Sequence, residues 1–229
     1  MSIGSSMLSV VPHDEQKLPC LGHFKKLLDC KTVRVVPPQH IIFSQGESPH
    51  TVCLICNGLV KLTRTESDGK PVIVGLRRTG WLLGAGALLP GRSYASTAET
   101  VTRSKLCLVP TEKLKQAMAT NALFSKWVAM MYGREVYSGM INISERCSLT
   151  GRQRLEKFLW EIVQNLNTGN TDKPVKLPIP LKHWELAQLL ALTPQHLSRL
   201  IRQMEKEGII RRKNGWLVLS EPKRLWHPE

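Results

Sequence analysis

Short apolar runs alternate with turn residues in the first half of the chain. Four runs rich in β-branched and other apolar residues lie here, at residues 33–36, 52–56, 59–65 and 72–76. Strands this short, with no helical periodicity between them, are typical of an antiparallel barrel or roll rather than a parallel sheet. Asn57-Gly58 and Asp68-Gly69 are the strongest hairpin signals between the runs.

Helical spacing replaces this alternation after Pro110. The sequence predicts a short helix over residues 111 to about 119 and a long helix over residues 123 to about 147. In the long helix, small and apolar residues recur at alternating steps of four and three: Ala129, Gly133, Val136, Met140, Ile143 and Cys147. This spacing is typical of a seam along which two helices pair, and a helix packed on its own barrel is the alternative.

A third region begins near Ser148. Thr150 can cap a helix that has one apolar face, formed by Leu155, Phe158, Leu159, Ile162 and Val163. Residues 183–202 then fit a helix-turn-helix, with a tight turn at Ala191-Leu192 and a second helix that starts at Thr193-Pro194. Threonine is a good N-cap and proline suits the first helical position. Ala191 stands where such turns often have glycine.

The second helix of this motif has two distinct faces. Its apolar face is formed by Leu197, Leu200, Ile201 and Met204. Its polar face is formed by Gln195, Ser198, Arg199 and Arg202, flanked by Thr193 and His196. Gln and Arg can make paired hydrogen bonds to adenine and guanine edges in the major groove, and Ser is adaptable. We therefore predict a DNA-reading helix, with an ordinary solvated helix face as the alternative.

Residues 209–219 are predicted to form a hairpin that turns at Asn214-Gly215. Arg211, Arg212 and Lys213 would then be placed to contact phosphates. A basic loop that only aids solubility is the alternative. With this hairpin, the region becomes a winged helix-turn-helix.

Composition and charge agree with a globular protein that binds a polyanion. The 229 residues are 42% hydrophobic and 22% charged, and 32 Lys and Arg against 18 Asp and Glu give a formal net charge of +14. No apolar run approaches the roughly 18 to 20 residues that span a bilayer. We expect a soluble cytoplasmic protein without membrane partners, whose six cysteines are reduced thiols.

The order of these parts resembles the Crp/Fnr family of bacterial transcription regulators over roughly residues 20–225. The roll has Gly46, Gly58 and Gly80 at its turns, and the long helix and the winged helix-turn-helix follow. The Fnr branch carries Glu-x-x-Ser-Arg in its recognition helix, where this chain has residues 195–199, Gln-His-Leu-Ser-Arg. The resemblance implies that Ser198 and Arg199 contact bases, with guanine as the target of Arg199. Gln195 replaces the acidic residue, which changes the expected preference at one base pair.

The family resemblance also implies a homodimer that reads a pseudo-palindromic double-stranded DNA site and cooperates with RNA polymerase. We therefore expect an α+β chain in three parts. A jelly-roll-like antiparallel β-roll sensor covers residues 1–120, a dimerisation helix 121–148 and the winged helix-turn-helix 149–229. No residue pattern indicates an enzyme, and a thiol-dependent hydrolase is the remote alternative.

The sensor region departs from the family pattern for cyclic AMP. That pattern has Gly-Glu-Leu and, farther on, Arg-Ser, whereas this chain has Gly84, Ala85 and Gly86 in the first position. When residues 95–98 and 109–110 are aligned with the family pattern, Tyr94 stands where the phosphate-binding arginine belongs. Arg92-Ser93 lies two residues earlier. We expect that cyclic AMP is not the effector.

The sequence is compatible with several other effectors or cofactors. An iron-sulfur cluster needs four thiolates, and the candidate ligands Cys20, Cys30 and Cys107 do not make a complete set. Haem, direct thiol oxidation and a hydrophobic or anionic small molecule near Arg77, Trp127 and Met131 are the other options. Cys53 and Cys56 point to opposite faces of a strand, which argues against a shared metal ion. A constitutive DNA-binding regulator with a vestigial sensor is a further alternative.

Overall fold

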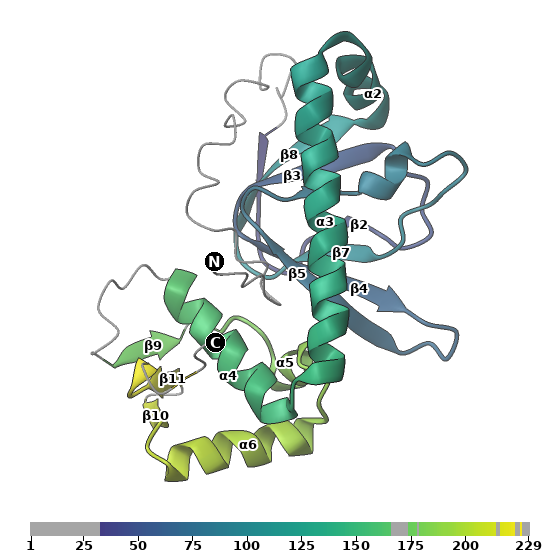
Figure 1. Cartoon of the computed structure of the whole chain (residues 1–229). Helices are drawn as coiled ribbons and strands as arrows, with labels where there is room; N and C mark the ends of the chain where they lie inside the picture. The colour runs from purple at the N-terminus through teal and green to yellow at the C-terminus, as the bar shows by residue number, and fades with distance from the viewer. Residues whose placement is uncertain (1–32, 166–173, 178, 214–215, 223–224, 226–229) are drawn as a thin grey trace. The chain divides into compact units, whose positions relative to one another are not determined.

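The computed structural model describes residues 33–165, 174–177, 179–213, 216–222 and 225 (Figure 1). The chain forms two compact units, and the division between them falls between Tyr137 and Ser138, inside the longest helix. Among the helices in these described stretches, none combines the length and apolarity needed to cross a membrane.

The first unit contains two four-stranded antiparallel sheets, as the alternating apolar runs predicted. One sheet has the order β1-β8-β3-β6, formed by Val33–Val36, Ser104–Pro110, Thr51–Asn57 and Leu82–Leu83. The other has the order β2-β7-β4-β5, formed by Ile41–Phe43, Thr97–Thr100, Leu59–Thr65 and Pro71–Arg78. A short 3₁₀ helix, η2 (Ala85–Leu88), follows β6.

The two strongest hairpin signals have different outcomes. Asp68-Gly69 joins β4 to β5, which pair antiparallel, and Gly69 has a left-handed φ of 76°, so this hairpin is confirmed. Asn57-Gly58 instead joins β3 to β4, which belong to different sheets, so a hairpin there is wrong. Gly58 has φ 115°, and a Cβ atom at this position would lie 2.9 Å from Cα of Ser104. The glycine permits a close crossing between sheets.

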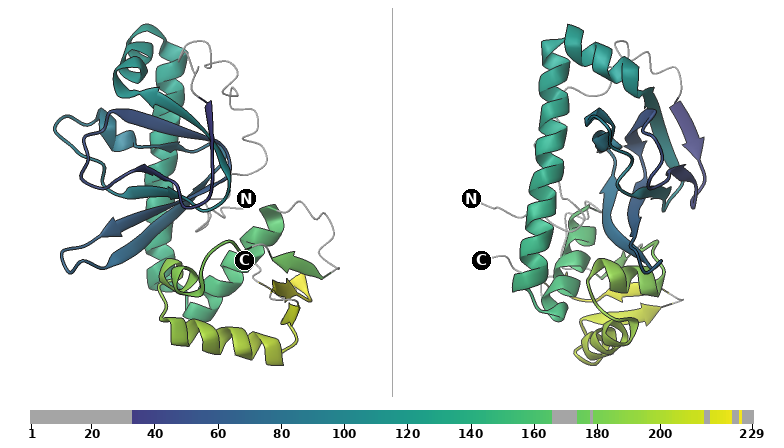
Figure 2. Two further views of the ribbon diagram at one scale, coloured as in Figure 1. Left: turned by 180° about the vertical axis from the view of Figure 1, so that it is seen from behind. Right: turned by 90° about the vertical axis from the view of Figure 1, so that its right-hand side faces the viewer.

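The predicted short and long helices are both present. α2 (Thr111–Thr120) and α3 (Ala122–Ser148) match the predicted spans within a residue or two. Figure 2 shows α3 as one continuous helix. All six residues of the predicted seam, Ala129, Gly133, Val136, Met140, Ile143 and Cys147, lie on its exposed side.

The alternation of β3 divides the first unit into two cores. Val52 and Leu54 pack with α2 and α3 residues such as Phe124. Their neighbours Cys53 and Ile55 face the other way and pack with residues of the second sheet. Because successive strand residues point to opposite faces, one sheet separates the interior of the roll from the helical layer.

The second unit is a helical domain with a small sheet. α4 (Gly151–Asn165) buries the predicted apolar face, and α5 (His183–Leu189) and α6 (Pro194–Lys206) form the predicted helix-turn-helix. β10 (Ile210–Lys213) and β11 (Trp216–Leu219) pair antiparallel with Lys213 opposite Trp216. The predicted turn at residues 214–215 lies outside the described residues.

A third strand, β9 (Val175–Leu177), pairs with β11 and extends this sheet to the order β10-β11-β9. The sequence pattern did not predict this strand. Three residues are too few to show alternation clearly, and the prolines that follow suggest a connecting segment.

Candidate nucleic-acid interface

The start of α6 is fixed by the predicted cap. Thr193 has extended backbone angles, its Oγ1 accepts a hydrogen bond of 3.1 Å from the His196 amide, and Pro194 occupies the first helical position. The four apolar residues of the helix, Leu197, Leu200, Ile201 and Met204, are all buried. The packing of this face leaves the opposite face turned outward.

The outward face of α6 carries the predicted DNA-reading residues. Gln195, Arg199 and Arg202 are exposed, and His196 and Ser198 are half-buried. The Arg202 Nε donates to the carbonyl oxygen of Ser198 at 3.3 Å. Within the described part of the chain, no carboxylate lies within 4 Å of the Arg199 guanidinium. No described carboxylate therefore competes with an external acceptor for its five N–H donors.

The turn before α6 is strained and supported by a buried arginine. Ala191, which stands where such turns often have glycine, has a left-handed φ of 52°, which costs about 1 to 2 kcal/mol for a residue with a Cβ atom. The Leu192 amide donates to the Ala187 carbonyl at 2.8 Å. Arg154 of α4 donates from Nε to the Leu190 carbonyl at 2.8 Å and from Nη2 to the Ala191 carbonyl at 3.4 Å. Burial lowers the pKa of Arg154, whose charge is directed at these backbone oxygens.

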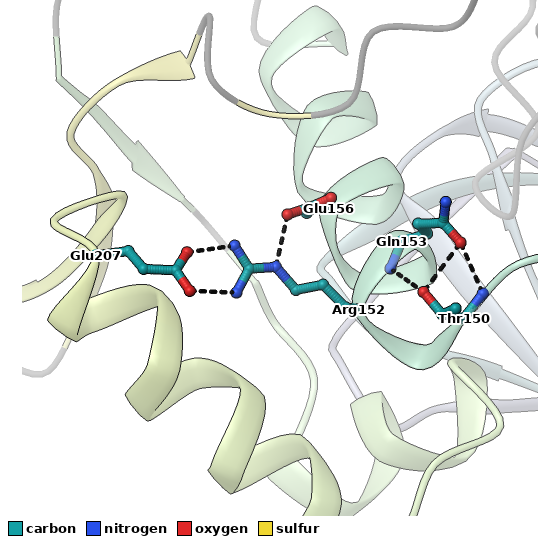
Figure 3. Close-up of polar contacts among 5 residues, drawn as sticks. All are labelled: Thr150, Arg152, Gln153, Glu156 and Glu207. Atoms are coloured by element: carbon teal, nitrogen blue, oxygen red, sulfur yellow. Dashed lines mark hydrogen bonds and ion pairs between the residues drawn. The ribbon is translucent and has the colours of Figure 1, made fainter.

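The other end of α6 is also tied to α4 (Figure 3). Arg152 makes paired hydrogen bonds to the Glu207 carboxylate at 2.6 and 3.2 Å, and its Nε donates to Glu156 at 2.6 Å. Thr150 and Gln153 hydrogen-bond reciprocally at the start of α4. Two arginines of α4 thus contact the turn before α6 and the C-cap residue of α6.

The basic residues after α6 lie on β10 and are exposed: Arg211, Arg212 and Lys213. Arg212 Nε forms an ion pair with Glu205 of α6 at 2.9 Å, which partly neutralises its charge. Arg211 and Lys213 have no carboxylate within 4 Å among the residues that the structure describes. These two residues are therefore the stronger candidates for phosphate contacts.

Tyr94 fills the place expected for a phosphate-binding arginine. Its ring is buried and stacks on Phe43 with a centroid separation of 4.0 Å. Its hydroxyl donates to the Thr51 carbonyl and accepts from the Thr51 amide at 3.1 Å. Arg92 and Ser93, two residues earlier, are exposed. This position offers no cation and no unused hydroxyl proton, so it does not fit the phosphate of a cyclic nucleotide.

The other candidate effector residues do not gather in one place. Trp127 and Met131 belong to the core between the sheet and the helices, whereas Tyr94 lies in the core inside the roll. Gly84 is beside Tyr94, since a Cβ atom there would lie 3.0 Å from the ring, and Gly86 follows in η2 with Ala85. One sheet therefore separates the two groups.

Arg77 is paired with a carboxylate and is therefore not available to an anionic effector. Its buried guanidinium donates from Nε to Glu135 of α3 at 2.9 Å and lies 4.7 Å from the ring centroid of Trp81. Arg134 lies over the same ring at 4.1 Å. These contacts attach the roll to the first part of α3.

The cysteines differ from the expectation in one respect. Cys107 is disulfide-bonded, so the prediction that every cysteine is a reduced thiol is wrong for Cys107. Cys53, Cys56 and Cys147 are thiols. Burial raises the pKa of Cys53, with a smaller effect from Cys56. Cys20 and Cys30 lie outside the described residues, and no metal-binding group of three is present within the described ranges.

Sequence reasoning missed the residues that support the recognition helix. Arg154 and Arg152 of α4 were not identified, and neither was His183 of α5, whose Nε2 lies 2.9 Å from Ser198 Oγ. Charged residues beside the apolar face of α4 were a signal for buried polar contacts. The carbonyl oxygens that they reach belong to distant segments, which no local pattern shows.

The two units together define a class of protein, a regulator with a β-roll and a winged helix-turn-helix. The family models agree: residues 33–121 match the cyclic nucleotide-binding domain and residues 153–227 match the Crp-like helix-turn-helix domain. Together these matches cover most of the chain. The protein belongs to the Crp/Fnr family of transcription regulators, as its sequence resemblance implied.

Known relatives are distant in sequence and similar in fold. Electron transport regulator A of Shewanella oneidensis is 22% identical over 185 residues, which are 80% of this chain and 73% of that protein. The nitrogen fixation regulation protein FixK of Rhizobium meliloti is 22% identical over 204 residues, 85% of this chain and 86% of that protein. The structure of the c-di-GMP-responsive global regulator CLP of Xanthomonas campestris has a TM-score of 0.72 at 17% identity, over 87% of this chain and 98% of that chain.

Proposed function

We propose that this protein is a homodimer that binds a pseudo-palindromic site on double-stranded DNA through α6 and regulates transcription in the cytoplasm. The observation that carries the proposal is the outward face of α6, where Arg199 is exposed beside Gln195 and Ser198. Arginine pairs with guanine O6 and N7, and glutamine with adenine N6 and N7. Arg211 and Lys213 would bind phosphates next to the groove. RNA polymerase is the protein partner that the family resemblance implies.

The exposed side of α3 supports the homodimer. Val136, Met140 and Ile143 are 62%, 65% and 68% exposed, and they continue the row of small residues formed by Ala129 and Gly133. Apolar side chains in a continuous row are rarely left in water, and the small residues allow a second helix to approach closely. A second copy of α3 would cover this row. Two copies of α6 would then read two half-sites about one helical turn apart.

Sedimentation equilibrium tests the dimer directly. The wild-type protein should sediment as a dimer, because the row on α3 is buried only when two copies pair. Ile143→Glu places a charge in that row and should yield a monomer with much weaker DNA binding. Val74→Glu, an exposed apolar position on β5, is the matched control and should leave the dimer intact. A monomeric wild-type protein would contradict this part of the proposal.

A regulator that binds DNA without an effector is the second candidate. The internal hydrogen bonds of Tyr94 agree with it, because they occupy the hydroxyl at the place where the family pattern has a phosphate-binding arginine. Equal DNA affinity with and without cyclic AMP would agree with both candidates. A difference between protein purified without oxygen and the same protein after oxidation would favour redox control, and identical affinity would favour the constitutive regulator.

A further inference from the structure

His183 connects the two helices of the helix-turn-helix at the DNA-reading face. It is the first residue of α5, and its Nε2 lies 2.9 Å from Ser198 Oγ and 3.1 Å from the carbonyl oxygen of Pro194. Ser198 and Pro194 are one turn apart on α6. One ring nitrogen therefore contacts both the backbone and the side chain of the recognition helix.

The contact with Pro194 decides where the proton lies. A carbonyl oxygen can only accept a hydrogen bond, so Nε2 must carry the hydrogen for a 3.1 Å contact to be favourable. The Nε2–H group is then shared between the Pro194 oxygen and Ser198 Oγ. The Ser198 hydroxyl accepts from His183, and its own hydrogen is directed elsewhere.

This arrangement determines whether the Ser198 hydroxyl acts as a donor or as an acceptor toward DNA. An unrestrained serine hydroxyl donates or accepts equally well, and so discriminates poorly between bases. With Oγ accepting from His183, the outward group is a donor. In the major groove, guanine N7 and O6, adenine N7 and thymine O4 are acceptors, whereas the amino groups of cytosine and adenine are donors. A hydroxyl held in this way favours an acceptor.

We propose that His183 is a positioning residue that holds the Ser198 hydroxyl as a hydrogen-bond donor toward an acceptor on a DNA base edge. The inference rests on the proposed DNA-binding function. It assigns to α5 a part in base selection, in addition to packing against α6.

The test begins with the full-length wild-type protein and a library of random-sequence DNA duplexes. If the wild type enriches no site, the DNA-binding proposal fails before any variant is made, and this inference fails with it. If a site is enriched, affinities are measured for that site and for each single base-pair substitution. The proteins compared are wild type, Ser198→Ala, His183→Ala, the double variant and His183→Gln.

We expect Ser198→Ala and His183→Ala each to weaken binding to the selected site by about two- to tenfold, the range for one net hydrogen bond. Both should lose preference at the same base pair. The double variant should bind no more weakly than Ser198→Ala, because the two residues act through one contact. His183→Gln retains a side-chain N–H donor and should restore most of the preference.

Control variants separate this role from a general structural one. His50→Ala, an exposed histidine of the first unit, should leave affinity unchanged. If His183→Ala lowers the melting temperature, its weaker binding could come from lost packing. His183→Phe keeps an aromatic ring but has no N–H donor, so it tests the hydrogen bond separately. Uniform weakening across all duplexes, additive losses in the double variant, or unchanged preference in His183→Phe would each overturn the inference.

Discussion

The outward face of α6 and the roll around Tyr94 and Arg77 both carry polar side chains, but these side chains differ in what they contact. On α6, Arg199 and Gln195 are exposed to an external partner. In the roll, the Tyr94 hydroxyl is satisfied by Thr51, and the Arg77 guanidinium by Glu135. The difference indicates that the polar groups of α6 are exposed to an external partner, whereas those of the roll stabilise the roll itself.

The largest expected effect concerns the support of the DNA-binding surface. Arg154→Met should destabilise the second unit by about 2 to 4 kcal/mol, because it leaves the buried carbonyl oxygen of Leu190 and the part-buried carbonyl oxygen of Ala191 without their donor. Hydrogen exchange should show faster exchange of α5 and α6 amides, with β3 and β8 unchanged. Arg211→Met, an exposed arginine on β10, is the control and should have little effect on stability.

The next effect concerns base reading. Arg199→Ala should weaken binding to the selected site by about 1 to 3 kcal/mol and relax the preference at one base pair. Lys213→Ala should instead weaken binding evenly across sequences and reduce the salt slope by about one, as a phosphate contact does. Binding titrations at several salt concentrations distinguish the two. Equal weakening on all duplexes in Arg199→Ala would make Arg199 a phosphate contact.

A smaller effect is expected in the roll. Tyr94→Phe should destabilise the first unit by about 0.5 to 1.5 kcal/mol, because it removes the hydrogen bonds to Thr51. Denaturant unfolding measures the change, with Tyr137→Phe on the exposed side of α3 as the control. If Tyr94→Phe has no effect on stability while DNA affinity changes, the tyrosine has a signalling role instead.

The smallest effect concerns Cys53. Burial raises the pKa of its thiol, so the folded state keeps the proton at a pH where the unfolded state has lost it. The contribution of this group to stability therefore falls as the pH rises above the ordinary value of 9.0. Cys53→Ala should flatten the stability profile above that pH. In the monomeric Ile143→Glu variant, alkylation should modify the exposed Cys147 much faster than Cys53, and equal rates would contradict the burial of Cys53.

The elements with strong periodicity could be predicted from the sequence. The α6 residues show their buried face at helical spacing, and Thr193-Pro194 marks its first turn. β9 could not be predicted because its three residues are stabilised by pairing with β11 and not by their own pattern. The hairpin predicted at Asn57-Gly58 was wrong because the same dipeptide that favours a hairpin also permits a crossing between sheets.

The candidate site was predictable in part for a related reason. Residues that face outward from α6 follow from its helical period, so Gln195 and Arg199 could be named in advance. The support from Arg154, Arg152 and His183 joins segments far apart in the chain, and a local pattern contains no information about such contacts. The disulfide bond of Cys107 is likewise a tertiary contact.

Selection of a duplex from a random library by the wild-type protein tests the central claim most directly. The account predicts enrichment of a pseudo-palindrome with half-sites about one helical turn apart, bound with a steep salt dependence. Selection with the Arg199→Ala variant should enrich sites in which one base pair of each half-site is no longer specified. Salt-dependent binding without any enriched sequence, or enrichment that is unchanged in Arg199→Ala, would contradict the claim that α6 reads DNA.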